Sequence, residues 1–126
     1  MNKQRNLNKD EIRERIIKAL KNVYDPEIPI NIYDLGLIYK IEISNDLEIR
    51  VEFTLTVPTC PMIVPIQDWI FQAVREAVPE AKKIEVVPVF DPPWTPKMMT
   101  KEGRELFKAI FGFDIVEEWE KKYGNM

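Results

Sequence analysis

The sequence predicts an α/β domain of the α+β type, in which helices cover a three-stranded mixed sheet in the order α-β-β-α-β-α. Residues 47–56 alternate apolar and polar side chains without a break, which is the period of a strand buried on one face. Apolar residues at helical spacing mark two other stretches, 9–22 and 62–77. The second stretch separates strand 47–56 from another strand candidate at 83–90. That order predicts a right-handed parallel crossover between the two strands.

The first helix is expected over about residues 9–22. Asn8 would cap its N-terminus with Glu11, in a variant of a capping box that usually starts with serine or threonine. The helix should end before Asp25-Pro26, because the residue that precedes a proline avoids helical geometry. Its apolar stripe would consist of Ile12, Ile16, Leu20 and Val23.

A hairpin is expected next. Strand candidates at 37–43 and 47–56 flank the turn-forming residues 44–46, Ser-Asn-Asp. The alternation in 47–56 places apolar side chains inward and polar side chains outward, so the hairpin should bury one face. Pro88 lies in the last strand candidate, 83–90, and predicts an edge strand or a bulge because proline cannot donate a ladder hydrogen bond.

Two proline-containing segments, 24–36 and 91–99, are expected to be irregular. The first is long enough to indicate a function of its own. After the second, Thr100 should cap a helix that continues to about Phe111, where Gly112 would end it. Asp114 would then cap a short last helix. The prediction is a single domain over 1–126, with a core at 8–112 and a short acidic helical tail at 113–126.

Composition limits the classes of function. The chain has 126 residues, of which 45% are hydrophobic, enough for a core without disulfides or structural metals. A net charge of −3 argues against nucleic acid as a partner. No apolar run approaches the roughly 20 residues that span a bilayer, and the polar N-terminus does not resemble a signal peptide. A single cysteine fits the cytoplasm, where thiols stay reduced.

Cys60 is the most informative residue, because it is the only cysteine and the chain has no histidine. One thiolate cannot complete a tetrahedral metal site by itself. Cys60 is therefore shared with a partner, used transiently, or without a chemical role. It precedes the predicted helix 62–77, and a helix N-terminus favours the thiolate through its free backbone amides. The alternative is a small buried hydrophobic residue.

Polar residues nearby could support this thiol. Thr56 and Thr59 could donate hydrogen bonds to a thiolate or a sulfide, although each is more often an ordinary strand or loop residue. Three carboxylates, Asp25, Glu27 and Asp34, lie within ten residues of one another. They could bind a hard cation or assist proton transfer, although helix capping and turn formation are commoner uses.

Other enzyme classes find little support. A cysteine nucleophile would lack the usual histidine base, which argues against a cysteine hydrolase. The sequence contains no phosphate-binding loop, dinucleotide fingerprint or paired-cysteine zinc motif. Trp94, framed by prolines, is equally consistent with a docking anchor and with core packing.

Three segments together carry a family resemblance: DPEIPINIYDLGLIY (25–39), TLTVPTCPM (54–62) and DPPWTPKMMTKEGRELF (91–107). In this order they closely resemble the SufT/PaaD-like family of metal–sulfur cluster biosynthesis proteins. The resemblance covers about residues 9–112. It implies the fold of iron–sulfur cluster assembly domains and a role in maturing or delivering iron–sulfur clusters.

The resemblance also assigns residues. It places the family's motif cysteine on Cys60 and its motif threonine on Thr56. Its acidic and tail positions fall on Asp25, Glu27, Asp34, Trp94, Thr95, Pro96, Glu102, Gly103 and Arg104. The PaaD proteins of phenylacetate breakdown carry a further cysteine-rich segment, whereas this chain has no cysteine after Cys60. It therefore resembles the stand-alone assembly factors.

Three hypotheses result. The first is an assembly or carrier factor in which Cys60 binds or transfers iron or a transient, shared iron–sulfur cluster. The second is an adaptor that recruits clients without holding a cluster, with Trp94, Glu102 and Arg104 as partner-binding residues. The third, a thiol-dependent enzyme, is the weakest, and we expect the chain not to be an enzyme. The expected partners are iron–sulfur assembly proteins and apo client proteins, without nucleic acid or membrane; a homodimer is left open.

Overall fold

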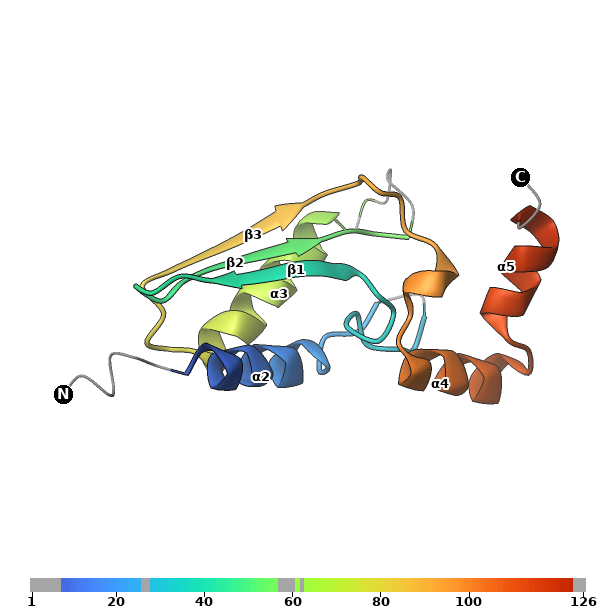
Figure 1. The fold of residues 1–126 in the computed structure, drawn as a ribbon, viewed down its shortest axis with the longest axis horizontal. Helices are drawn as coiled ribbons and strands as arrows, with labels where there is room; N and C mark the ends of the chain where they lie inside the picture. Colours follow the sequence, from blue (N-terminus) through green and yellow to red (C-terminus); the bar gives the residue numbers. More distant parts are fainter. Residues whose placement is uncertain (1–7, 26–27, 57–60, 62, 124–126) are drawn as a thin grey trace.

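A computed structural model describes residues 8–25, 28–56, 61 and 63–123. It confirms the predicted class and order of elements (Figure 1). The elements are α2 (Lys9–Leu20), β1 (Ile38–Ile43), β2 (Glu48–Phe53), α3 (Ile63–Ala77), β3 (Lys83–Pro88), the 3-10 helix η1 (Pro96–Met98), α4 (Lys101–Phe111) and α5 (Ile115–Tyr123).

The sheet has the order β1-β2-β3. β1 and β2 are antiparallel, with Ile41 opposite Val51, and β2 and β3 are parallel, with Val51 opposite Val86. α3 forms the crossover between the parallel strands, as predicted. β3 is an edge strand that ends at Pro88, the position that proline tolerates.

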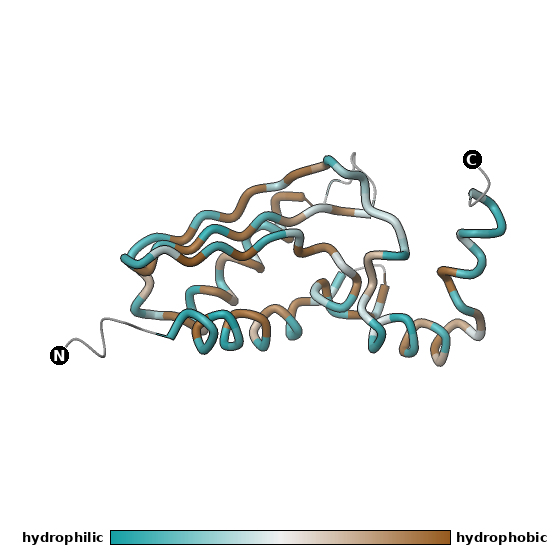
Figure 2. The backbone as a smooth tube through the Cα atoms, viewed as in Figure 1, coloured by the Kyte–Doolittle hydropathy of each residue, from teal (hydrophilic) through white to brown (hydrophobic). Residues whose placement is uncertain are grey.

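The two faces of the sheet differ in chemistry. α2 and α3 lie on one face (Figure 1), and the strands alternate hydrophobic and hydrophilic residues along their length (Figure 2). On the open face, Arg50 lies at the centre of a network of ion pairs, 3.2 Å from Glu52 and 3.0 Å from Glu85. The buried face includes Ile41, Ile43, Ile49, Val51, Phe53 and Val86, which pack against Ile12, Ile16, Leu20, Ile66, Ile70 and Val74.

β2 is shorter than the alternation predicted. It ends at Phe53 and does not continue to residue 56. A bulge at Tyr39 shifts the register of β1, and the backbone N–H of Thr54 then donates to Leu37 O at 2.8 Å. Thr54, expected as a polar residue on the outward face, is only 1% exposed and forms a hydrogen bond with Tyr39. The sequence pattern did not reveal this bulge.

The predicted helix caps are confirmed. The Asn8 side chain accepts hydrogen bonds from the N–H groups of Asp10 and Glu11, at 2.9 and 3.4 Å. Asp114 does the same at the start of α5, accepting from Val116 N at 2.9 Å. Gly112 ends α4 with a left-handed φ of 87°.

None of the described helices combines the length and the apolar character needed to cross a bilayer.

Candidate functional site

The segment 31–36, in the first predicted irregular region, is held together by Asn31 and Asp34. Asn31 Oδ1 accepts from Asp34 N at 2.8 Å, and Asn31 Nδ2 donates to Asp34 Oδ2 at 2.8 Å. Asn31 is a buried polar residue, so these bonds satisfy a side chain that would otherwise be costly to bury. Asp34 therefore shapes this turn, which is the commoner use considered for it.

Thr100 joins this turn to the second irregular region. Its hydroxyl donates to Asp34 Oδ1 at 2.7 Å and accepts from Gly103 N at 3.0 Å. The backbone N–H of Thr100 also donates to Asp34 O at 3.0 Å. One hydroxyl thus caps α4, as predicted, and clamps two segments that lie 66 residues apart.

Two glycines allow these segments to approach closely. A Cβ atom on Gly103 would lie 2.3 Å from Asp34 O, and one on Gly36 would lie 2.3 Å from Met98 O. Both distances are too short for any side chain. Gly36 also has a φ of 80°, which residues with a side chain rarely adopt. Glycine is therefore required at both contacts.

Trp94 strengthens the same junction. Its indole Nε1 donates to Leu35 O at 2.7 Å, and its half-buried ring packs against the hydrophobic core. This geometry favours core packing over a free docking anchor. Trp94 therefore positions the segment that follows β3.

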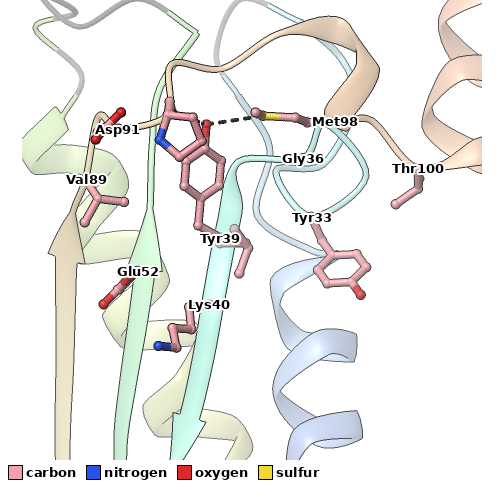
Figure 3. A pocket seen from close by; sticks show the side chains of 11 residues that line it. Tyr33, Gly36, Tyr39, Lys40, Glu52, Val89, Asp91, Met98 and Thr100 are labelled. Atoms are coloured by element: carbon pink, nitrogen blue, oxygen red, sulfur yellow. Dashed lines mark hydrogen bonds between the residues drawn. The ribbon is translucent and has the colours of Figure 1, made fainter.

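An open pocket of about 640 Å³ lies beside this junction, where β1 begins and β2 and β3 end (Figure 3). β2 ends here at Phe53, and Cys60 follows β2 in the sequence. Both irregular regions contribute to the pocket. Its lining residues are Tyr33, Gly36, Ile38, Tyr39, Lys40, Glu52, Val89, Asp91, Pro92, Met98 and Thr100.

Tyr39 is the central polar group of the pocket. Its hydroxyl lies 2.8 Å from Pro92 O and 3.2 Å from the thioether sulfur of Met98 (Figure 3). Burial raises the pKa of Tyr39, and a hydrogen bond with Thr54 opposes that shift. The phenol therefore stays protonated at neutral pH, and its single proton can be donated to one of these two acceptors.

The charged groups at the pocket mostly belong to the open face of the sheet. Lys40 Nζ lies 3.1 Å from Glu42, and Glu52 accepts from Arg50 at 3.2 Å. Asp91 is exposed at the rim. The pocket therefore has a mainly apolar wall with charges of both signs around it, which suits a peptide segment better than a simple anion.

Several predicted site residues lie outside the described residues, namely Cys60, Thr59 and Glu27. Thr56 is half-buried beyond the end of β2. Asp25 Oδ1 accepts from Ile28 N at 3.2 Å, a turn contact of the kind considered for this cluster. Among residues 8–25, 28–56, 61 and 63–123, no three histidine, cysteine, aspartate or glutamate side chains form a metal-binding group.

The remaining partner-binding candidates lie on α4. Glu102 is exposed in the first turn of this helix. Arg104 donates to Asp114 at 3.1 Å and so joins α4 to the start of α5.

Sequence reasoning missed Asn31 and Tyr39 as residues that organise the site. For Asn31, the only available signal was the turn sequence YDLG (33–36) that follows it. For Tyr39, nothing in the neighbouring sequence indicated that its side chain would reach Pro92 and Met98.

Comparison with known proteins decides the family. Residues 13–87 match the model of a family described as iron-sulfur cluster assembly protein. This chain belongs to that family. It is 42% identical over 93 residues to a Fe-S protein maturation auxiliary factor of Porphyromonas gingivalis, which covers 71% of this chain and 85% of the relative. The auxiliary factor SufT of Staphylococcus aureus is 40% identical over 82 residues, covering 65% of this chain and 92% of the relative.

Solved structures agree. A domain of unknown function from Bacillus anthracis superposes with a TM-score of 0.73 at 28% identity, covering 82% of this chain and 94% of that domain. The family and its neighbours confirm the SufT/PaaD-like resemblance and the fold. The family match ends at residue 87, so the Met98 and Thr100 contacts come from the chain beyond it.

Proposed function

We propose that this chain is an iron–sulfur protein maturation factor that binds iron or a cluster in transit through the Cys60 thiolate, and that it is not an enzyme. Membership of the iron-sulfur cluster assembly family supports the process. The observation that supports the residue is that Cys60 is the only thiol of a chain without histidine. It stands three positions before Ile63, the first residue of α3.

The position of Cys60 suits a labile site. The free N–H groups and the dipole at the start of a helix favour a thiolate over a thiol. A single thiolate leaves the metal with open positions, which a second subunit, a small thiol or a client would fill. Thr56 and Thr59 would donate hydrogen bonds to sulfur. Asp25 and Asp34 make turn contacts, so we assign them to shaping the site.

The pocket favours a second candidate function, an adaptor that recruits clients without holding a cluster. The two irregular regions, 24–36 and 91–99, meet in it, through Tyr33 and Gly36 on one side and Asp91, Pro92 and Met98 on the other. An apolar wall with a charged rim is typical of a site for a peptide segment. In this case Cys60 would have no ligand role.

Anaerobic reconstitution with iron and sulfide tests the first proposal. We expect visible absorption and stoichiometric iron in the wild-type protein and the loss of both in Cys60→Ser, which keeps the size of the side chain. Thr100→Ser serves as a control that keeps its hydroxyl and should behave as wild type. Equal iron binding in wild type and Cys60→Ser would contradict the assigned ligand.

Pull-down with assembly proteins and an apo client separates the two candidates. Asp91→Lys reverses an exposed charge at the pocket rim and should leave the fold intact. The adaptor function predicts that Asp91→Lys reduces capture while Cys60→Ser does not. Trp94→Ala is a poor probe, because it also removes the hydrogen bond to Leu35.

A further inference from the structure

The two edges of the sheet differ in how they are protected. Figure 1 shows β1 along one margin of the sheet and β3 along the other. On β3, the Gln67 side chain donates to Val86 O at 2.7 Å, and Pro88 has no N–H to offer. In the part of the chain that the structure describes, no strand lies on the outer side of β1.

The backbone groups that β1 leaves unpaired can be identified. Ser44 N donates to Glu48 O at 2.9 Å, so Ser44 faces β2. Because hydrogen-bonded positions alternate in an antiparallel pair, Glu42 and Lys40 also bond to β2, and Ile41 and Ile43 direct their N–H and C=O groups outward. The side chains of Ile41 and Ile43 are 7% and 8% exposed, whereas those of their respective partners in the central strand, Val51 and Ile49, are 0% and 1% exposed.

We propose that a second copy of this chain pairs antiparallel along the outer edge of β1, with Ile41 on the two-fold axis. Ile41 would then exchange hydrogen bonds with Ile41 of the second copy. Lys40 would lie opposite Glu42 of the second copy, and Glu42 opposite its Lys40. These pairs occupy the non-hydrogen-bonded positions, where side chains of neighbouring strands approach most closely.

Charge selects this register from its neighbours. A residue whose backbone N–H and C=O groups point away from β2 must lie opposite a residue of the second copy that does the same. If Lys40 and Glu42 are both to lie within the paired stretch, the two-fold axis can pass only through Lys40, Ile41 or Glu42. An axis at Lys40 places two lysines opposite each other, and an axis at Glu42 places two glutamates opposite each other. Only the axis at Ile41 gives two pairs of opposite charge and no like-charge pair.

The geometry also limits the assembly. Pairing is isologous, and β3 is closed by Gln67 and Pro88, so association stops at a dimer with one continuous sheet. β1 is short, and the bulge at Tyr39 ends its regular stretch. The interface therefore falls below the standard size, and we expect a weak dimer that forms at high protein concentration. This inference does not depend on the proposed function.

Sedimentation equilibrium over a wide concentration range tests the interface by charge exchange. Lys40→Glu and Glu42→Lys each create two like-charge pairs across the axis and should weaken the dimer about tenfold. The double exchange in one chain should restore it. A mixture of the two single variants should form a heterodimer, because each supplies the charges that the other lacks. Lys83→Glu, an equal charge change on β3, should leave the dimer unchanged.

Circular dichroism of each variant checks that the monomer stays folded, as we expect for charge changes at exposed positions. Recovery of the dimer in the double variant and in the mixture would support the β1 interface. A wild-type protein that stays monomeric at every concentration would overturn it. A dimer that responds equally to Lys40→Glu and Lys83→Glu, or that the double exchange does not restore, would also overturn it. Neither measurement involves iron binding, so a negative result for the dimer would not bear on the proposed function.

Discussion

At the scale of single residues, the Thr100 hydroxyl has two roles that different substitutions can test. It accepts from Gly103 N and donates to Asp34. Thr100→Val keeps the shape and removes both bonds, so we expect a loss of roughly 1–3 kcal/mol in the free energy of unfolding. Urea denaturation measures the loss. Thr100→Ser keeps the hydroxyl and should cost much less; equal losses would show that the hydroxyl is not what stabilises the junction.

Gly103 offers a second test at this scale. A methyl group there would overlap Asp34 O, so Gly103→Ala should destabilise the fold by roughly 1–3 kcal/mol, although alanine favours helix. Gly112→Ala, at the other end of α4, meets no atom within 4 Å. It should cost about 1 kcal/mol through its left-handed backbone. Thermal unfolding of both variants measures these losses. A Gly103→Ala variant as stable as wild type would contradict the close approach of Gly103 to Asp34 O.

At the scale of elements, Arg15 joins α2 to the end of α3. It donates to Ala77 O at 3.0 Å and to both carboxylate oxygens of Glu80, at 2.9 and 3.0 Å. The hydrogen bond from Arg15 lowers the pKa of Glu80. A lowered folded-state pKa gives stability that is present above the unfolded pKa, about 4.3, and that is lost as the pH falls.

Glu80→Gln should therefore reduce stability at pH 7 and lose this effect as the pH falls below about 4. Both side chains are more than a third exposed, so the effect at pH 7 should stay within about 1 kcal/mol. Urea denaturation from pH 3 to pH 7 measures it. Glu76→Gln, at an exposed position on α3, is the matched control. A Glu80→Gln effect that grows toward acid pH would contradict the assignment.

α5 depends on Asp114 for its attachment. Asp114 caps this helix and accepts from Arg104, and Val116 is the residue that α5 buries. Asp114→Ala should increase the amide hydrogen exchange of residues 116–123 and leave the sheet unchanged. Glu118→Gln, which removes only an exposed pair with Lys121, is the matched control. Equal exchange in the two variants would mean that packing alone holds α5.

At the scale of the whole molecule, local sequence patterns predicted the architecture but did not predict the long-range contacts. The alternation in 47–56 and the caps at Asn8, Thr100 and Asp114 are local patterns, and the structure has a strand or a helix start at each. The bonds from Thr100 to Asp34 and from Trp94 to Leu35 span 66 and 59 residues. No spacing rule encodes such contacts, so the clamp beside the pocket could not be predicted.

The site was predicted less completely than the fold. Asp34 was singled out as a carboxylate for chemistry, and its neighbours make it a turn residue. Trp94 was considered as an anchor for partners, and its indole is bonded within the chain. In both cases the contacts of the residue indicate its structural role, and each residue has at least one hydrogen-bond partner in a distant segment, Thr100 for Asp34 and Leu35 for Trp94.

Cluster transfer to an apo client protein is the most direct test of the central claim that Cys60 carries iron or a cluster in transit. The wild-type protein, loaded anaerobically, should activate an apo iron–sulfur enzyme at a rate that rises with its concentration. Cys60→Ser, shown to be folded by circular dichroism, should reduce that rate to the level of free iron and sulfide. Activation by Cys60→Ser at the wild-type rate would contradict the claim.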